Sequence, residues 1–117
     1  MKVSELKEKH LDYWVAMAEG HEQYYPNDST NPERFNWLTH GQFGSAIETP
    51  HYSTNWQFGG AIIDREAISI ELHLDGAEAY AYVVDGSDAT AHGETALIAA
   101  MRCYVASKFG DEVEEPA

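Results

Sequence analysis

Histidine, cysteine and serine are the residue types in this sequence that could support metal or nucleophilic chemistry. No serine stands in the Gly-x-Ser-x-Gly context of a nucleophile elbow, and Cys103 falls inside an apolar, helix-like stretch. Zinc ligands usually occur as close pairs on one element, a spacing that is absent among His10, His21, His40, His51, His73 and His92. We therefore expect no metal site, no cofactor and no catalytic residue, and predict that the protein is not an enzyme.

The segment 50–60 has the residue pattern that best fits a ligand pocket. It combines aromatic rings that could stack on a flat ligand with hydroxyl and amide groups that could hydrogen-bond it. Two arginines elsewhere are candidate countercharges for an anionic group. The candidate ligand-binding residues are Tyr52, Ser53, Thr54, Asn55, Trp56, Arg65 and Arg102. The alternative is that the aromatic segment anchors itself to the core, and we favour it because buried rings dominate small cores.

Two helices and a hairpin are predicted to position these residues. Apolar residues recur at helical spacing from about Glu8 to Glu19, where Gly20 is the expected stop, and again from Thr95 to Phe109 before Gly110. Residues 67–74 alternate with period two and predict a strand. A turn at Asp75-Gly76 leads into a second alternating run at 79–84, so an antiparallel hairpin is expected.

The remaining segments are interpreted less directly. A short apolar run at 60–64 predicts a third strand on the edge of the hairpin, with Asp64 and Glu66 forming ion pairs or a solvated edge around Arg65. Residues 85–88 together with Gly93 indicate a loop. From His21 to His51 the chain is rich in turn residues and in large rings, which predicts an ordered loop with a short helix at 32–38.

These elements predict one α+β domain over residues 1–117. A small antiparallel sheet of about three strands is expected to pack against an N-terminal and a C-terminal helix, with the long aromatic-rich loop draped over it. The acidic tail at 111–117 is expected to fray into solvent. A lone cysteine and the lack of an apolar run of membrane-spanning length favour a cytosolic protein.

The charge balance is strongly acidic. Twenty Asp and Glu against seven Lys and Arg give a formal net charge of −13. Nucleic-acid affinity rests largely on Lys and Arg, so direct binding to nucleic acid or to an anionic membrane is not expected. Half of the acids lie between Glu71 and Glu115, where Arg102 and Lys108 are the basic residues. We interpret the acidity first as a contribution to solubility, and expect that any basic partner docks on the C-terminal half.

Three blocks of the sequence resemble the NinX family of tailed-phage and prophage proteins. The most specific block runs from Thr95 to Val113, and the others are Leu11-Asp12-Tyr13-Trp14-Val15-Ala16 and Tyr52-Ser53-Thr54-Asn55-Trp56 with Gly59-Gly60 and Ile62 to Glu66. The resemblance implies a phage or prophage accessory protein made inside an infected or lysogenic bacterium. The family provides no catalytic residues to carry over.

Two binding hypotheses remain open. In the first, the protein captures a small, nucleotide-like ligand through the aromatic segment and Arg65 or Arg102. In the second, it is an interaction module whose acidic surface docks on a basic host or phage protein. Mimicry of the charge of a nucleic acid is one way in which it could do so. Homo-oligomerisation is compatible with both hypotheses.

Overall fold

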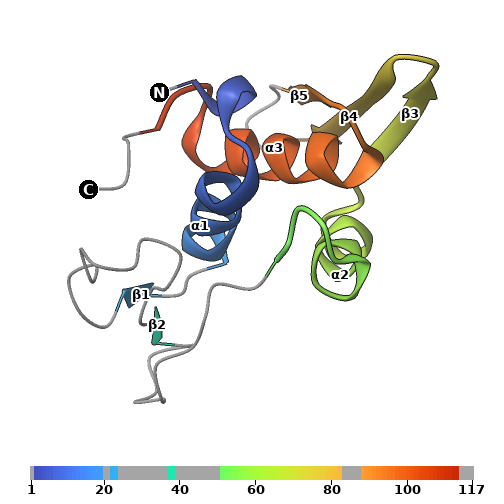
Figure 1. Cartoon of the computed structure of the whole chain (residues 1–117). Coiled ribbons are helices and arrows are strands. Elements are labelled where there is room, and N and C mark those ends of the chain that lie inside the picture. The colour runs from blue at the N-terminus through green and yellow to red at the C-terminus, as the bar shows by residue number, and fades with distance from the viewer. Residues whose placement is uncertain (1, 20–21, 24–36, 39–50, 83–87, 114–117) are drawn as a thin grey trace.

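The computed structural model describes residues 2–19, 22–23, 37–38, 51–82 and 88–113. They form a small α+β fold, as the sequence predicted. A three-stranded antiparallel sheet, in the order β3-β4-β5, consists of β3 (Ser69–His73), β4 (Gly76–Tyr82) and β5 (Asp88–Gly93). Helix α3 (Ala96–Phe109) lies on one face of this sheet, and α1 (Glu8–Ala18) and α2 (Trp56–Glu66) pack against α3 (Figure 1).

Helix α3 is therefore a middle layer, with the sheet on one side and α1 and α2 on others. A helix enclosed from several sides has no single apolar stripe. Its buried residues accordingly point to most sides of the helix: Leu97, Ala99, Ala100, Met101, Cys103, Tyr104 and Val105. The sheet meets α3 with small side chains, since Ala77, Ala79 and Ala81 of β4 and Ala89 and Ala91 of β5 are all buried. Small residues on both sides allow the helix and the sheet to approach closely.

The predicted hairpin is confirmed, with Ile70 opposite Ala79 and Glu71 opposite Glu78. The predicted last helix is also confirmed: the Thr95 hydroxyl accepts a hydrogen bond from the Ile98 N–H at 3.1 Å, and Gly110 ends the helix with φ +85°. The N-terminal helix ends one residue earlier than expected, and Gly20 lies outside the described residues.

Two predictions about the sheet were wrong. Residues 60–64 are part of helix α2 instead of a third strand, because Asn55 caps a helix there by accepting the Gln57 N–H at 2.9 Å. The third strand is β5, within residues that we interpreted as a loop. Asp64, Arg65 and Glu66 therefore belong to the last turn of a helix, not to a strand edge.

Two short segments complete the described chain. Glu22–Gln23 (β1) pairs antiparallel with Trp37–Leu38 (β2), so the end of the helix predicted at 32–38 is wrong, while residues 32–36 and most of the aromatic-rich loop lie outside the described residues. The first and last parts of the described chain meet at an antiparallel bridge between Lys2 and Glu112, beside the one-turn helix η1 (Val3–Glu5). Asp111 to Val113, where fraying was expected to begin, are thus paired, and Val113 is buried.

Candidate functional site

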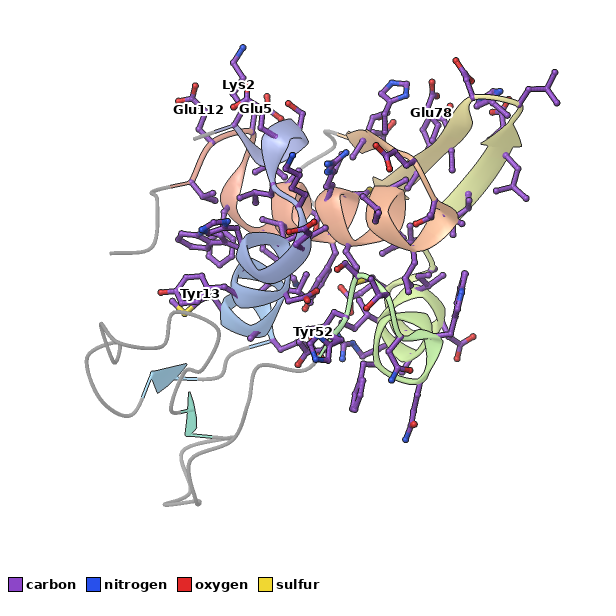
Figure 2. The ribbon with its side chains drawn as sticks, viewed as in Figure 1. Lys2, Glu5, Tyr13, Tyr52, Glu78 and Glu112 are labelled. Atoms are coloured by element: carbon purple, nitrogen blue, oxygen red, sulfur yellow. The ribbon has the colours of Figure 1, made fainter. Side chains whose placement is uncertain are left out.

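The aromatic segment before α2 is anchored on α1. Asp12, which is 4% exposed, accepts the Ser53 N–H on its Oδ1 at 2.8 Å, and His51 Nδ1 lies 3.8 Å from its Oδ2. Tyr52 is buried with its ring edge-on to Phe58, and burial raises the pKa of its hydroxyl to about 12. Tyr52 and Ser53 therefore anchor the segment to the core, as in the alternative interpretation; Tyr52 is labelled in Figure 2.

Three of the remaining candidate residues lie at the start of α2. Asn55 uses its side chain as the helix cap, and the backbone N–H groups of Thr54 and Asn55 both donate to the His51 carbonyl oxygen. Trp56 is 58% exposed in the first turn of the helix. The residues proposed to surround a ligand thus fall into two parts: Tyr52 and Ser53 are buried, and the residues that follow them form the exposed start of α2.

Arg65 links the C-terminal ends of α1 and α2 to the middle of α3. Its Nη1 and Nη2 donate to the two carboxylate oxygens of Glu19 at 3.0 and 2.5 Å, and its Nε donates to Glu66 at 2.9 Å. The Tyr104 hydroxyl of α3 donates to Glu19 at 2.7 Å and accepts from Arg65 Nη2 at 3.1 Å. These hydrogen bonds raise the pKa of Arg65 above its already high ordinary value. The arginine is committed to this network, which makes it a poor countercharge for a ligand.

Arg102 is in a different place. It stands two residues from Tyr104 on α3, about 200° around the helix, and so faces away from the Arg65 network. Its Nε donates to the Leu6 carbonyl oxygen at 2.8 Å, and its Nη1 donates to the His92 carbonyl oxygen at 2.9 Å. Partial burial lowers its pKa. The structure therefore does not bring Arg102 together with Arg65 and the aromatic segment.

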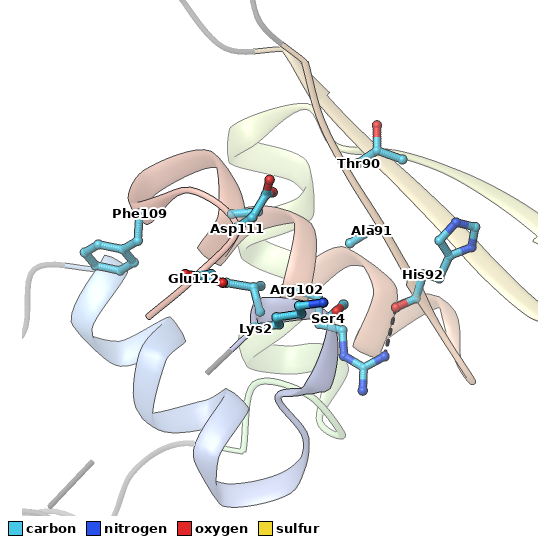
Figure 3. Close-up of a pocket in the computed structure, with 11 residues that line it drawn as sticks. Lys2, Ser4, Thr90, Ala91, His92, Arg102, Phe109, Asp111 and Glu112 are labelled. Atoms are coloured by element: carbon cyan, nitrogen blue, oxygen red, sulfur yellow. Dashed lines mark hydrogen bonds between the residues drawn. The ribbon is translucent and has the colours of Figure 1, made fainter. Parts of the chain in front are cut away.

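Arg102 lines a groove between β5 and the joined chain ends (Figure 3). The groove has a volume of about 790 Å³, and β5 provides one wall through Thr90, Ala91 and His92. The opposite wall carries Lys2, Val3, Ser4, Asp111 and Glu112, and α3 contributes Arg102, Ala106 and Phe109. A smaller pocket of about 340 Å³ at the hairpin end of the sheet also includes Arg102 and His92.

The sheet face opposite α3 is the most acidic surface that the strands present. Strand alternation and register place Glu71 of β3, Glu78 of β4 and His92 of β5 in one row across this face. Figure 2 shows Glu78 projecting away from α3. From Glu66 to Met101 the sequence contains no Lys or Arg, whereas its acids are Glu66, Glu71, Asp75, Glu78, Asp85, Asp88 and Glu94.

Tyr80 organises the carboxylates of this acidic sheet face, which we define by Glu71, Glu78 and Asp88. Its hydroxyl donates to Glu78 and lies 3.5 Å from Glu71, and the bond to Glu78 raises the pKa of Tyr80 to about 12. His92 lies 3.4 Å from Glu78, and His73 lies 3.7 Å from Glu71. Within the described residues, no group of three or more His, Cys, Asp or Glu is placed to hold a metal ion.

Sequence reasoning missed this face because it did not recognise β5. The signal was present, since Asp88, Thr90 and His92 alternate with Ala89, Ala91 and Gly93. Alanine and glycine are poor strand formers, and the Asp-Gly-Ser-Asp stretch at 85–88 indicated a loop. Here the small residues are required because they lie under α3.

The comparisons with known proteins identify the family of this chain. The family described as "Bacteriophage P22, NinX" matches residues 2–108, which is almost the whole chain. The search of curated proteins finds no match. None of the helices among the described residues is long and apolar enough to cross a membrane.

Proposed function

Because the chain belongs to the phage P22 NinX family, we propose that this small phage-encoded protein is a non-enzymatic accessory factor whose acidic sheet face docks on a basic host or phage protein. The observation that carries the proposal is that Glu71 of β3 and Glu78 of β4 lie side by side, with Asp88 of β5 on the same sheet face, and that the three strands contain no Lys or Arg. A cytoplasmic site of action in the bacterial host would follow from this role.

The geometry of the face favours a protein partner with clustered Lys or Arg. Glu71 is 61% exposed and Glu78 is 25% exposed in their side chains, so a partner could reach both carboxylates. Tyr80 adds an aromatic ring between them, and tyrosines are enriched at protein interfaces. Charge-assisted hydrogen bonds from arginine to paired carboxylates would give both affinity and register.

Binding without catalysis is supported by the state of the groups that could act as nucleophiles. Cys103 is fully buried, and desolvation raises the pKa of its thiol to about 11, so the reactive thiolate is scarce at neutral pH. Ser53 is buried as well, and its N–H is used to anchor the chain on Asp12.

The test compares two variants that each remove two negative charges. Glu71→Gln with Glu78→Gln alters the acidic sheet face, whereas Glu5→Gln with Glu8→Gln alters exposed residues near α1. Proteins retained from host lysate by the wild type at low salt should be lost with the sheet variant and with increasing ionic strength, but kept by the control variant. Equal retention by both variants would reject the acidic sheet face as the docking site.

A second candidate function is capture of a small anionic ligand in the groove at Arg102. The observation in its favour is that Arg102 forms no ion pair with any described residue, and that its hydrogen bonds to Leu6 and His92 use two of its five N–H donors, both on backbone oxygens. Lys2 and His92 line the same groove. Thermal-shift screening with cyclic and adenosine nucleotides tests this idea: a stabilising ligand should lose its effect in Lys2→Gln, and a flat response across the compounds counts against it.

A further inference from the structure

The β3–β4 hairpin carries exposed apolar side chains. Leu72 is 73% exposed and Leu74, in the turn, is fully exposed. Ile70 lies on the same side of β3 as Leu72 and is half-buried. Single exposed leucines are ordinary, but two of them beside a strand edge form a surface suited to association.

Strand β3 is also an edge of the sheet. In the order β3-β4-β5 its inner side pairs with β4, and no described strand pairs with its outer side. An edge strand offers unpaired backbone N–H and C=O groups to another strand. Among the described residues, β3 thus combines an unpaired edge with an apolar flank.

We propose that a second copy of this chain pairs antiparallel with β3 about a two-fold axis at Leu72. This register places Leu72 against Leu72, Ile70 against Leu74, and Glu71 against His73 of the second copy. Apolar residues then meet on one side of the sheet, and a carboxylate meets an imidazole on the other. Centring the axis on Glu71 instead would oppose two carboxylates, which is unfavourable.

The pairing would join the two three-stranded sheets into one. Because a two-fold axis through a directly opposed residue pair is perpendicular to the sheet, both α3 helices would lie on one side and both acidic sheet faces on the other. The inference goes beyond the proposed docking function and does not depend on it. A dimer could form without any basic partner, and a monomer could still bind one.

Self-association is tested on the full chain by sedimentation and light scattering up to about 1 mM protein. Leu72→Lys places like charges opposite each other at the axis and should weaken dimerisation at least about tenfold. Thr90→Lys makes the same kind of change on the exposed side of β5 and should leave the dimer intact. A protein that stays monomeric, or a dimer equally sensitive to both changes, would overturn the proposal.

The register is tested by cysteine cross-linking with oxidised glutathione. Leu72→Cys should give a disulfide-linked dimer readily, because directly opposite strand residues have Cα atoms about 4.5–5.5 Å apart, within the range for a disulfide. Leu74→Cys, which would face Ile70 of the second copy, should cross-link much more slowly. The buried native Cys103 is the background in both variants. Equal rates for the two variants would rule out an axis at Leu72.

Discussion

Asp12 shows how one buried side chain can determine the position of a predicted site. Its carboxylate fixes the chain at Ser53, so the segment that was expected to form a pocket packs against α1. Burial raises the pKa of Asp12, although the Ser53 N–H and His51 favour its charged form. A raised pKa means that the neutral carboxyl fits the fold best. The stability gained from the neutral carboxyl is complete below the pKa that Asp12 has in the unfolded chain, and it is lost as pH rises through the higher pKa of the folded protein.

Substitution of Asp12 should therefore separate its charge from its role as an acceptor. Asp12→Asn keeps an oxygen for the Ser53 N–H and removes the buried charge, so it should be more stable than the wild type at pH 7, with the gain disappearing in acid. Asp12→Ala leaves the N–H without its acceptor and should lose about 1–3 kcal/mol. Chemical denaturation at pH 7 and pH 4 measures both effects, and an Asn variant less stable than the wild type at pH 7 would contradict this account.

Helix α2, like β5, was not recognised from the sequence, and its glycines explain why. Gly59 and Gly60 are poor helix formers, and Ala61, Ile62 and Ile63 form an apolar run of strand length. The helix forms because Gly59, Ile62 and Ile63 share the face turned toward the core. A Cβ on Gly59 would overlap the Tyr52 carbonyl oxygen and lie 2.6 Å from Leu97 Cδ1. The contact between α2 and α3 therefore requires a glycine, which local propensity cannot reveal.

The two adjacent glycines should respond oppositely to alanine. Gly59→Ala should cost about 1–3 kcal/mol because the methyl group meets backbone and a packed leucine. Gly60→Ala is the matched control: its Cβ would lie 3.3 Å from a carbon of the exposed Trp56 ring, which can move, so the variant should gain about 0.5–1 kcal/mol of helix stability. Thermal and urea unfolding of the two variants checks the prediction, and similar losses in both would show that the space at Gly59 is not decisive.

At the level of the elements, prediction succeeded where the local pattern and the packing demand agreed. The alternation at 68–74 and the Thr95 cap both reflect local chemistry, and both are present in the structure. The register of alanines under α3 and the network at Arg65 depend on residues far apart in the sequence, such as Glu19 and Tyr104. Spacing within one segment has no information about such contacts, so Arg65 and Arg102 were both interpreted as candidate countercharges for a ligand.

For the whole molecule, pH should affect stability from the alkaline side as well. The pKa of Cys103 is raised from 9.0 to about 11 and that of Tyr52 from 10.0 to about 12, in both cases mainly by burial. The stability gained from each neutral group is complete below the pKa of that group in the unfolded chain, and it is lost as pH rises through the higher pKa in the folded protein. Stability should thus fall between pH 9 and pH 12. Cys103 alone should account for about 2 kcal/mol by pH 11.

Denaturant unfolding at a series of pH values from 8 upward measures this decline. Cys103→Ala removes the thiol, so its free energy of unfolding should fall less steeply than that of the wild type between pH 9 and pH 11. The comparison uses slopes, and a lower starting stability of the variant does not obscure it. Identical slopes would mean that the thiol does not control the alkaline limit.

Ionic strength should distinguish the two forms of association. Each copy carries a net charge of −13, so two copies repel each other and added salt should strengthen pairing through β3. Docking of a basic protein on the acidic sheet face is driven by attraction and should weaken with the same salt.

The bridge between Lys2 and Glu112 has a mechanical consequence. The Val3 N–H donates to the Asp111 carbonyl oxygen, so the first and last parts of the described chain lie antiparallel and in contact (Figure 1). Because the two segments are antiparallel, a force that pulls the two ends apart would separate them like a zipper, one hydrogen bond at a time. Under tension, the contact between Lys2 and Glu112 should therefore break first, and η1 and the end of α3 should detach before the sheet begins to unfold.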